Sequence, residues 1–508
     1  MSAEKEVIKK DEAAQSMPDA NLSADSDTKS ESERVTRMGT GSIPKLVLEF
    51  AIPAILGMIV NGTYQIIDSV FLGHGVGELG LTAVTVASPI MTVFMALAML
   101  IGAGGNALCA LRLGEGKHDE AENILGNTAV LGVIVSLALA VLTHVPAFIE
   151  FLMTLSSATD TVRPYAREFI QIISTGCVFQ IVGMGLNNFI RTSGAPNRAF
   201  LTMLIGAVGC TVFNAIFVLG LGLGVAGSAL ATICGMFISF LTVIWYFTRT
   251  PNVPIRLRLK YLPLKRKLVT SILTLGTASF AIQIGSAVSM LVTNYALARY
   301  GAMDPIGADD ALAAIGVVGR VAMFTILPLI GMSVAIQPLL GFNYGARLWE
   351  RVRTTLRVGV IGATIIGTLM WILIMLFAPQ IIGFFGISEE SLVDLAAFAL
   401  RVNLVFLPIV GFQIVGSNYF QATGQPAKSI ILSLTRQILF LIPLTLIFPE
   451  VLPYIITSID SLDAVYFAVP AADFLAIFTV GVFVFIEMRK IGRRIAEESA
   501  QKDDACTA

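Results

Sequence analysis

The chain has 508 residues, of which 55% are hydrophobic and 14% are charged, and its mean hydropathy is +0.80. Soluble globular domains carry about 25% charged residues, so this composition excludes an ordinary soluble enzyme or binding domain. The sequence therefore indicates a membrane protein, and no nucleic-acid partner is expected.

Residues 1–42 are polar and nearly free of aromatic side chains, so they cannot form a packed core and are expected to be a disordered cytoplasmic tail. Long apolar segments follow, and an apolar helix of about 20 residues crosses roughly 30 Å of hydrocarbon while satisfying its own backbone hydrogen bonds. We expect twelve membrane-spanning helices, at residues 46–72, 81–111, 124–146, 165–190, 198–219, 225–248, 269–298, 311–342, 356–378, 393–420, 429–448 and 464–487.

The chain divides into two halves of six helices. We expect an N-terminal lobe at 43–248, a basic, proline-containing cytoplasmic linker at 249–267, a C-terminal lobe at 268–488 and a cytoplasmic tail at 489–508. The segment from Leu81 aligns without a gap with the segment from Leu312, and two shorter matches follow in the same order. Copies with an even number of spans share one topology. The sequence predicts an all-α membrane protein whose two lobes are related by a pseudo-two-fold axis along the membrane normal.

Lysine and arginine gather at one end of the expected helices, in the linker and in the loops around residues 112–117 and 347–357. The opposite end carries Arg163, Arg167 and Arg299. Because cytoplasmic loops are enriched in basic residues, both termini are expected in the cytoplasm and the protein in the cytoplasmic (inner) membrane of the cell.

Asp68 lies in the stretch IIDSVFLG, inside an apolar run. A carboxylate near the middle of a bilayer costs several kcal/mol unless it faces a cavity, a partner or a cation. The first six expected spans hold no lysine or arginine at a similar depth. Asp68 is therefore expected to bind a coupling ion, with a structural ion pair as the alternative.

Cysteine and histidine give no sign of a metal site or a disulfide framework, because four of the five cysteines fall in expected spans and the three histidines are scattered. No glycine loop has the spacing of a nucleotide-binding P-loop. We expect neither a cofactor nor a catalytic site, so any transport draws on an ion gradient or runs downhill.

Four motifs occur in order along the chain: IPAILGMIVNGTYQIIDSVFLG, LIGAGGNALCALRLGEGKHDEA, RTSGAP and LGLGLGVAGSALAT. Together they resemble the multidrug and toxic compound extrusion (MATE) family, in its bacterial multidrug-export branch, over about residues 43–490. The resemblance implies a V-shaped pair of lobes, and we expect the protein to be a monomer. It also implies efflux of small organic, often cationic compounds across the bilayer, coupled to H⁺ or Na⁺.

The resemblance also implies an ion site in the N-terminal lobe. The family's aspartate falls on Asn214, its asparagine on Cys210, its threonine on Thr232 and its tyrosine on Phe169, so three positions depart from the family pattern. A shift of one turn would instead make Asn214 the family's asparagine. With Asp68 as the one carboxylate, this lobe suits a proton better than a caged sodium ion, which prefers oxygen ligands.

The C-terminal lobe lacks the acids of the family's second cation site, so no such site is expected there. It carries charged residues within its expected spans, among them Arg320 and Asp473. Asp473 is expected to form a structural ion pair with Arg320 or Arg436, with gating as the alternative. Pro53 is a candidate hinge that would move Asp68, and Gln65 is a candidate cavity residue.

The leading hypothesis is thus a cation-coupled antiporter. The alternative is a flippase for a lipid-linked headgroup, which needs a cationic cavity that Arg320, Arg401 and Arg436 would supply. A passive channel or receptor is a third possibility, but neither needs a titratable group in the middle of the membrane.

Overall fold

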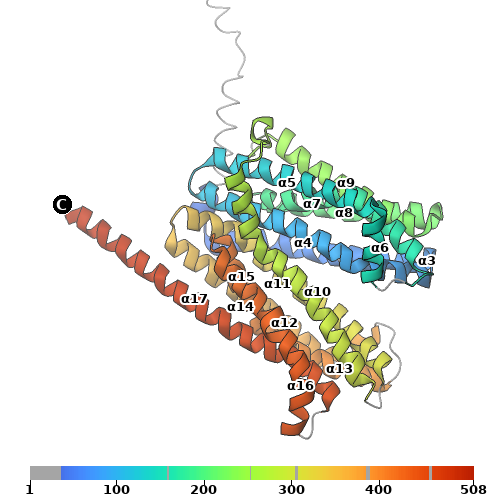
Figure 1. The fold of residues 1–508 in the computed structure, drawn as a ribbon. Helices are drawn as coiled ribbons and strands as arrows, with labels where there is room; N and C mark the ends of the chain where they lie inside the picture. Colours follow the sequence, from blue (N-terminus) through green and yellow to red (C-terminus); the bar gives the residue numbers. More distant parts are fainter. Residues whose placement is uncertain are drawn as a thin grey trace, which may run out of the picture.

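The structure is a computed structural model that describes residues 36–156, 159–251, 253–303, 307–384, 390–456 and 460–507. All regular elements of this part of the chain are helices, and they form two lobes that meet at one end and diverge toward the other (Figure 1). Eleven of these helices are long and apolar enough to cross a membrane, or twelve if one bent pair counts as a single span. The predicted all-α membrane architecture is confirmed.

The N-terminal lobe comprises α3 to α9, including one stretch of π-helix, η1. Their bounds are α3 Ile43–Gly75, α4 Glu78–Gly114, α5 His118–His144, α6 Pro146–Leu155, α7 Arg163–Thr192, α8 Pro196–Asn214, η1 Ala215–Gly220 and α9 Gly224–Arg249. The C-terminal lobe follows a 3₁₀ turn, η2, in the linker. Its elements are η2 Leu259–Tyr261, α10 Arg266–Gly301, α11 Ala308–Gly345, α12 Trp349–Phe384, α13 Glu390–Asn403, α14 Leu407–Ala422, α15 Pro426–Leu434, η3 Thr435–Leu441, α16 Ile442–Ile455 and α17 Ser461–Thr507.

Proline and glycine set the same helix boundary in both lobes. In the motifs RTSGAP and QATGQP, Gly194 (φ 81°) and Gly424 (φ 74°) adopt the left-handed conformation that ends a helix. The prolines that follow, Pro196 and Pro426, begin α8 and α15, where a missing backbone N–H costs no hydrogen bond. The internal repeat thus reproduces a local structure, as well as an apolar pattern.

Two features of the spans differ from the sequence prediction. The expected single span at 393–420 is two helices, α13 and α14, bent by 47° where they meet. Pro408 lies in the first turn of α14, where a proline cannot donate the backbone hydrogen bond that would continue α13. The short helix α6 was not predicted, because ten residues cannot cross a membrane.

The expected tail boundary at residue 42 was wrong, because residues 36–40 are helical. Met38 is buried, and Arg351 Nη2 donates to the carbonyl oxygens of Met38 (3.0 Å) and Gly41 (2.8 Å). This segment is therefore fastened to α12 of the other lobe. Residues 1–35 of the expected tail lie outside the described residues, and residues 489–507 continue α17 as helix.

The basic linker is bound to the N-terminal lobe along the beginning of α5. Glu122 accepts a hydrogen bond from the Arg256 backbone N–H (3.0 Å) and forms an ion pair with Arg258 Nε (3.2 Å). Further along, Asn127 Oδ1 accepts from the Lys265 backbone N–H at 2.8 Å. The linker follows the N-terminal lobe up to the residue before α10, so it does not act as a free tether.

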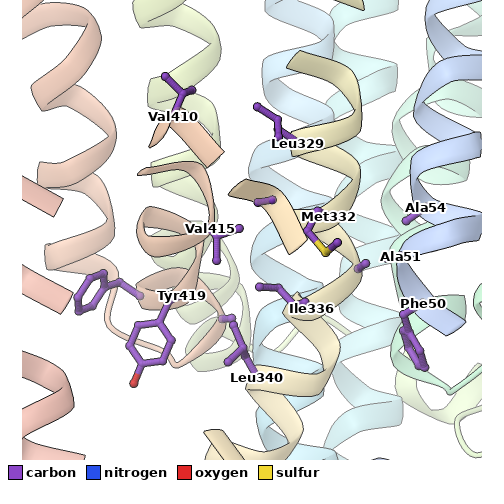
Figure 2. Close-up of a cluster of buried hydrophobic side chains, with 14 of the residues drawn as sticks. Phe50, Ala51, Ala54, Leu329, Met332, Ile336, Leu340, Val410, Val415 and Tyr419 are labelled. Atoms are coloured by element: carbon purple, nitrogen blue, oxygen red, sulfur yellow. The ribbon is translucent and has the colours of Figure 1, made fainter. Parts of the chain in front are cut away.

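The lobes share one hydrophobic core in the half that carries the basic loops. There α11 lies between α3 and α14, with Phe50 and Ala54 of α3 on one side and Tyr419 of α14 on the other (Figure 2). Met332 and Ile336 of α11 belong to the same buried cluster. This packing fixes α3, and therefore positions Asp68 relative to both lobes.

Candidate functional site

Asp68 is half-buried on α3 and faces the other helices of its own lobe. Its Oδ1 accepts a hydrogen bond from Asn214 Nδ2 of α8 at 2.8 Å and one from Ser228 Oγ of α9 at 3.1 Å. Three helices therefore meet at this carboxylate, and α3 is distant in sequence from α8 and α9.

Two more predicted residues extend the group. The Asn214 amide nitrogen also lies 3.5 Å from Cys210 Sγ, one turn earlier on α8, and the Cys210 thiol points to Thr232 Oγ1 of α9 at 4.0 Å. The structure thus brings together all four residues proposed for cation coupling, Asp68, Asn214, Cys210 and Thr232. With Ser228 they are called the Asp68 cluster below.

Close backbone approaches explain why these helix faces meet. A Cβ atom at Gly235 of α9 would stand 2.6 Å from Cys210 Cβ and 2.8 Å from the Gly206 carbonyl oxygen, so only glycine lets α9 lie this close to α8. A Cβ atom at Gly75, near the end of α3, would collide with Val218 of η1. Small residues at such crossings are how membrane helices approach each other closely.

A π-helix, η1, follows Asn214 directly, and π-turns often occur at functional sites because they redirect side chains. Gly222 and Gly224, with φ of 64° and 62°, then reverse the chain into α9. Since these conformations strain any other residue, the Gly-rich motif LGLGLGVAG is needed to return the chain so that Ser228 faces Asp68.

The partners of Asp68 are neutral. Among the described residues, no lysine or arginine forms an ion pair with it, and no three His, Cys, Asp or Glu side chains are grouped as a metal site would require. Asn214 is 1% exposed and its amide oxygen Oδ1 has no hydrogen-bond partner within that part of the chain. A buried oxygen without a partner is costly, so this atom is available to a donor or a cation.

The oxygen donors of the cluster suit a small hard cation or a proton. A carboxylate, an amide oxygen and two hydroxyls are ligands that sodium accepts, whereas the Cys210 thiol is too soft to contribute. A proton on Asp68 would equally neutralise the charge, and a protonated carboxyl can donate a hydrogen bond. The arrangement is thus able to exchange one positive charge with a single carboxylate.

Three other candidate residues lie outside the cluster. Phe169 of α7 is buried in an apolar group with Val225 and Ala229 of α9, where it has no polar atom to offer. Gln65 is exposed, and its side-chain amide bonds to the Asn61 carbonyl of its own helix at 3.3 Å. Pro53 is buried inside α3, about four turns before Asp68.

The charged pair of the C-terminal lobe is Asp473 with Arg436, whose Nε lies 2.5 Å from Asp473 Oδ1. The Asp473 side chain is 4% exposed, so the expected structural ion pair is present. Arg320, the other expected partner, is exposed on α11, and Arg401 is exposed on α13, so the expectation that these two arginines are buried charges of the spans was wrong. Hydropathy identifies a span, but it does not tell which face of the helix a single charge occupies.

Ser228 is the member of the cluster that the sequence did not single out. It lies in the motif GVAGSALAT, one helical turn before Thr232, so both side chains share one face of α9. This i, i+4 spacing from Thr232 is the feature of the sequence that could have identified Ser228 as a member of the cluster.

Known proteins resemble this chain over most of its length. The MatE family model matches residues 53–217 and 302–447. The multidrug export protein MepA of Staphylococcus haemolyticus is 25% identical over 443 residues, which are 86% of this chain and 93% of that protein. MepA of Staphylococcus aureus is 22% identical over 77% of this chain and 84% of its own.

Solved structures of the same kind match across both lobes. A structure of the MATE multidrug transporter DinF-BH, determined in a complex, is 30% identical, with a TM-score of 0.79 over 88% of this chain and 96% of its own. An outward-facing conformation of a MATE family transporter of the MOP superfamily has a TM-score of 0.82 at 24% identity, over 90% and 98% of the two chains.

Proposed function

This chain belongs to the MatE family, as its motifs indicated, and from that premise we propose that it is a cation-coupled antiporter that exports drug-like organic compounds. MepA and DinF-BH, which it resembles over most of its length, are named as a multidrug exporter and a multidrug transporter. Such proteins move their cargo without converting it, so no catalysis is proposed.

One observation carries the coupling proposal: among the described residues, Asp68 is held only by neutral hydrogen-bond donors, and it lies beside the unpaired amide oxygen of Asn214. A half-buried carboxylate without a counter-ion favours whatever positive charge can reach it. A proton or a sodium ion from the outside would supply that charge. With one carboxylate in the cluster, we favour the proton.

Coupling requires that ion and drug bind to different states of the lobes. The hydrogen bonds from Asn214 and Ser228 to the Asp68 carboxylate hold α3 against α8 and α9. These hydrogen bonds weaken when the ion neutralises the charge of Asp68. Pro53 leaves one carbonyl of α3 without a helical partner, so α3 can bend there at low cost. We propose that this bend changes the drug site, so that ion binding releases the drug.

The basic loops support an orientation of the protein in the membrane. Because cytoplasmic loops are enriched in lysine and arginine, we place the end that carries the linker and both chain termini in the cytoplasm. The lobes diverge at the other end, which then faces outward (Figure 1). Each lobe contributes half of the path, so a single chain suffices and a monomer is proposed.

The alternative of a flippase for a lipid-linked headgroup gains no support from the buried charges. A phosphate-binding cavity needs arginines that are free to bind an anion. Of the three arginines that would supply it, Arg436 is already neutralised by Asp473, and Arg320 and Arg401 are exposed instead of lying with it in a buried group.

The test is transport by Asp68→Asn in reconstituted vesicles, with efflux of a fluorescent organic cation followed under an imposed proton or sodium gradient. The neutral variant keeps the volume of the side chain but cannot be charged, so we expect gradient-driven efflux to fall at least about 100-fold while the protein stays folded and inserted. The matched control is Ser69→Ala, whose hydroxyl bonds within α3. Efflux at the wild-type rate in Asp68→Asn would show that Asp68 is not the coupling group.

A further inference from the structure

A chain of polar side chains, all buried except the half-buried Asn418, crosses from one lobe to the other. Thr192 Oγ1 of α7 donates to Asn106 Oδ1 of α4 at 2.5 Å, and Asn106 Nδ2 donates to Gln337 Oε1 of α11 at 3.3 Å. Gln337 Nε2 lies 3.5 Å from Asn418 Oδ1 of α14, whose Nδ2 donates to Ser333 Oγ at 2.8 Å. These five residues are called the relay. Its central bond, Asn106 to Gln337, joins the lobes directly.

The two residues of the central bond are equivalent in the internal repeat. The alignment that pairs Leu81 with Leu312 and Gly114 with Gly345 also pairs Asn106 with Gln337. A two-fold rotation exchanges equivalent positions, so two that touch must lie close to the axis. The relay therefore sits on the pseudo-two-fold axis of the protein, about 12 Å from the basic end of both α4 and α11.

The backbones around the relay are in close contact. A Cβ atom at Gly114 would collide with the Phe342 carbonyl oxygen, and one at Gly345 with that of Leu111. Deeper in the membrane, a Cβ atom at Gly276 of α10 would collide with the Leu100 carbonyl oxygen of α4. Here the lobes meet without intervening side chains, so they cannot rotate against each other without separating.

The centre of the relay is shielded from solvent. Asn106 is 1% exposed and Gln337 5% exposed, and in these surroundings an unpaired amide costs about the full desolvation of the group. If the lobes part and water enters, the same amides bond to water at little cost. The amides of the relay are therefore satisfied when the lobes are fully closed and when water fully hydrates them. Partly separated lobes would leave these amides without partners and are disfavoured.

We propose that the relay is the inner gate of this transporter: its Asn106–Gln337 bond holds the cytoplasmic end shut and breaks when the drug site opens inward. The proposal rests on the proposed function, because only a transporter that opens alternately to either side of the membrane needs the lobes to separate at the relay. It also gives a role to the RTSGAP motif, since Thr192 fixes the side-chain orientation of Asn106.

The gate can be tested without measuring transport, by the distance between spin labels on Lys117→Cys and Glu350→Cys, which are exposed residues at the basic end of the two lobes. Cys506 is replaced by serine, and the other four cysteines are buried or half-buried inside helices. In Asn106→Leu, the Gln337 amide has lost its partner and can form a hydrogen bond with water only when the two lobes separate at the relay. We therefore expect the population with long distances to rise about five- to tenfold.

The double variant Asn106→Leu with Gln337→Leu removes both amides of the central bond, so the long-distance population should fall below that of Asn106→Leu alone. The exchange Asn106→Gln with Gln337→Asn keeps the bond and should behave as wild type, which also controls for folding. Identical distance distributions in wild type, single and double leucine variants would overturn the gate. Because the readout is a distance, that result would be distinguishable from a failure of the coupling proposal, which is measured as efflux.

Discussion

The two lobes share one plan, yet they treat a buried carboxylate differently. Asp68 in the N-terminal lobe accepts hydrogen bonds from an amide and a hydroxyl, whereas Asp473 in the C-terminal lobe is paired with the guanidinium of Arg436. The first carboxylate still lacks a positive charge and the second already has one. A repeated fold therefore does not repeat its chemistry, and we propose that the exchangeable charge belongs to the lobe in which no described arginine reaches the acid.

The largest effect that would sharpen this comparison is on stability in the C-terminal lobe. Arg436→Met leaves the carboxylate of Asp473 uncompensated in a buried position, so we expect a loss of about 3–5 kcal/mol in the free energy of unfolding. The double variant Arg436→Met with Asp473→Leu removes both charges and should recover most of that loss. Thermal unfolding in detergent measures the loss in the single variant and the recovery in the double variant.

Asp68→Asn is compared with Asp473→Asn in the same thermal unfolding measurement. Because Asp68→Asn removes no salt bridge, it should shift the melting temperature far less than Asp473→Asn. A comparable loss of stability in both variants would break the distinction between a coupling acid and a structural acid.

A smaller effect is expected from the neighbour of Asp68. Asn214→Leu removes the 2.8 Å hydrogen bond to the carboxylate and the unpaired amide oxygen. Hydrogen bonds to charged groups contribute about 1.5–3 kcal/mol, so the ion concentration for half-maximal efflux should shift about 10- to 100-fold. The control is Thr211→Val, whose hydroxyl bonds within α8. An unchanged ion dependence in Asn214→Leu would remove this residue from the ion site.

The smallest effect concerns Ser228, whose bond to Asp68 is longer, at 3.1 Å. Ser228→Ala should shift the same half-maximal concentration about three- to tenfold, since a single hydroxyl contributes roughly 1 kcal/mol. The change should be visible in the ion dependence and absent from thermal stability. If stability falls instead, Ser228 serves the packing of α9 and the Asp68 cluster is smaller than proposed.

The composition of the cluster was largely predictable, for a local reason. Cys210 and Asn214 are one turn apart on α8, as Ser228 and Thr232 are on α9, so the helical period alone places each pair on one face. That both faces turn toward Asp68 depends on close contacts such as that of Gly235 with Gly206. Ser228 was missed because a serine in a glycine-rich segment is equally typical of a turn.

The amino-acid sequence by itself determined the membrane class, the two lobes and the isolated carboxylate, because apolar length, internal repetition and the absence of nearby basic residues can be read along the chain without knowing which helices touch. Only the tertiary structure decided that Arg436 and not Arg320 neutralises Asp473, that residues 36–42 bind to Arg351, and that Asn106 meets Gln337 on the axis. Each of these contacts joins residues that are far apart in the chain. Their pairing depends on helix rotation and on glycine contacts between backbones, which no apolar periodicity encodes.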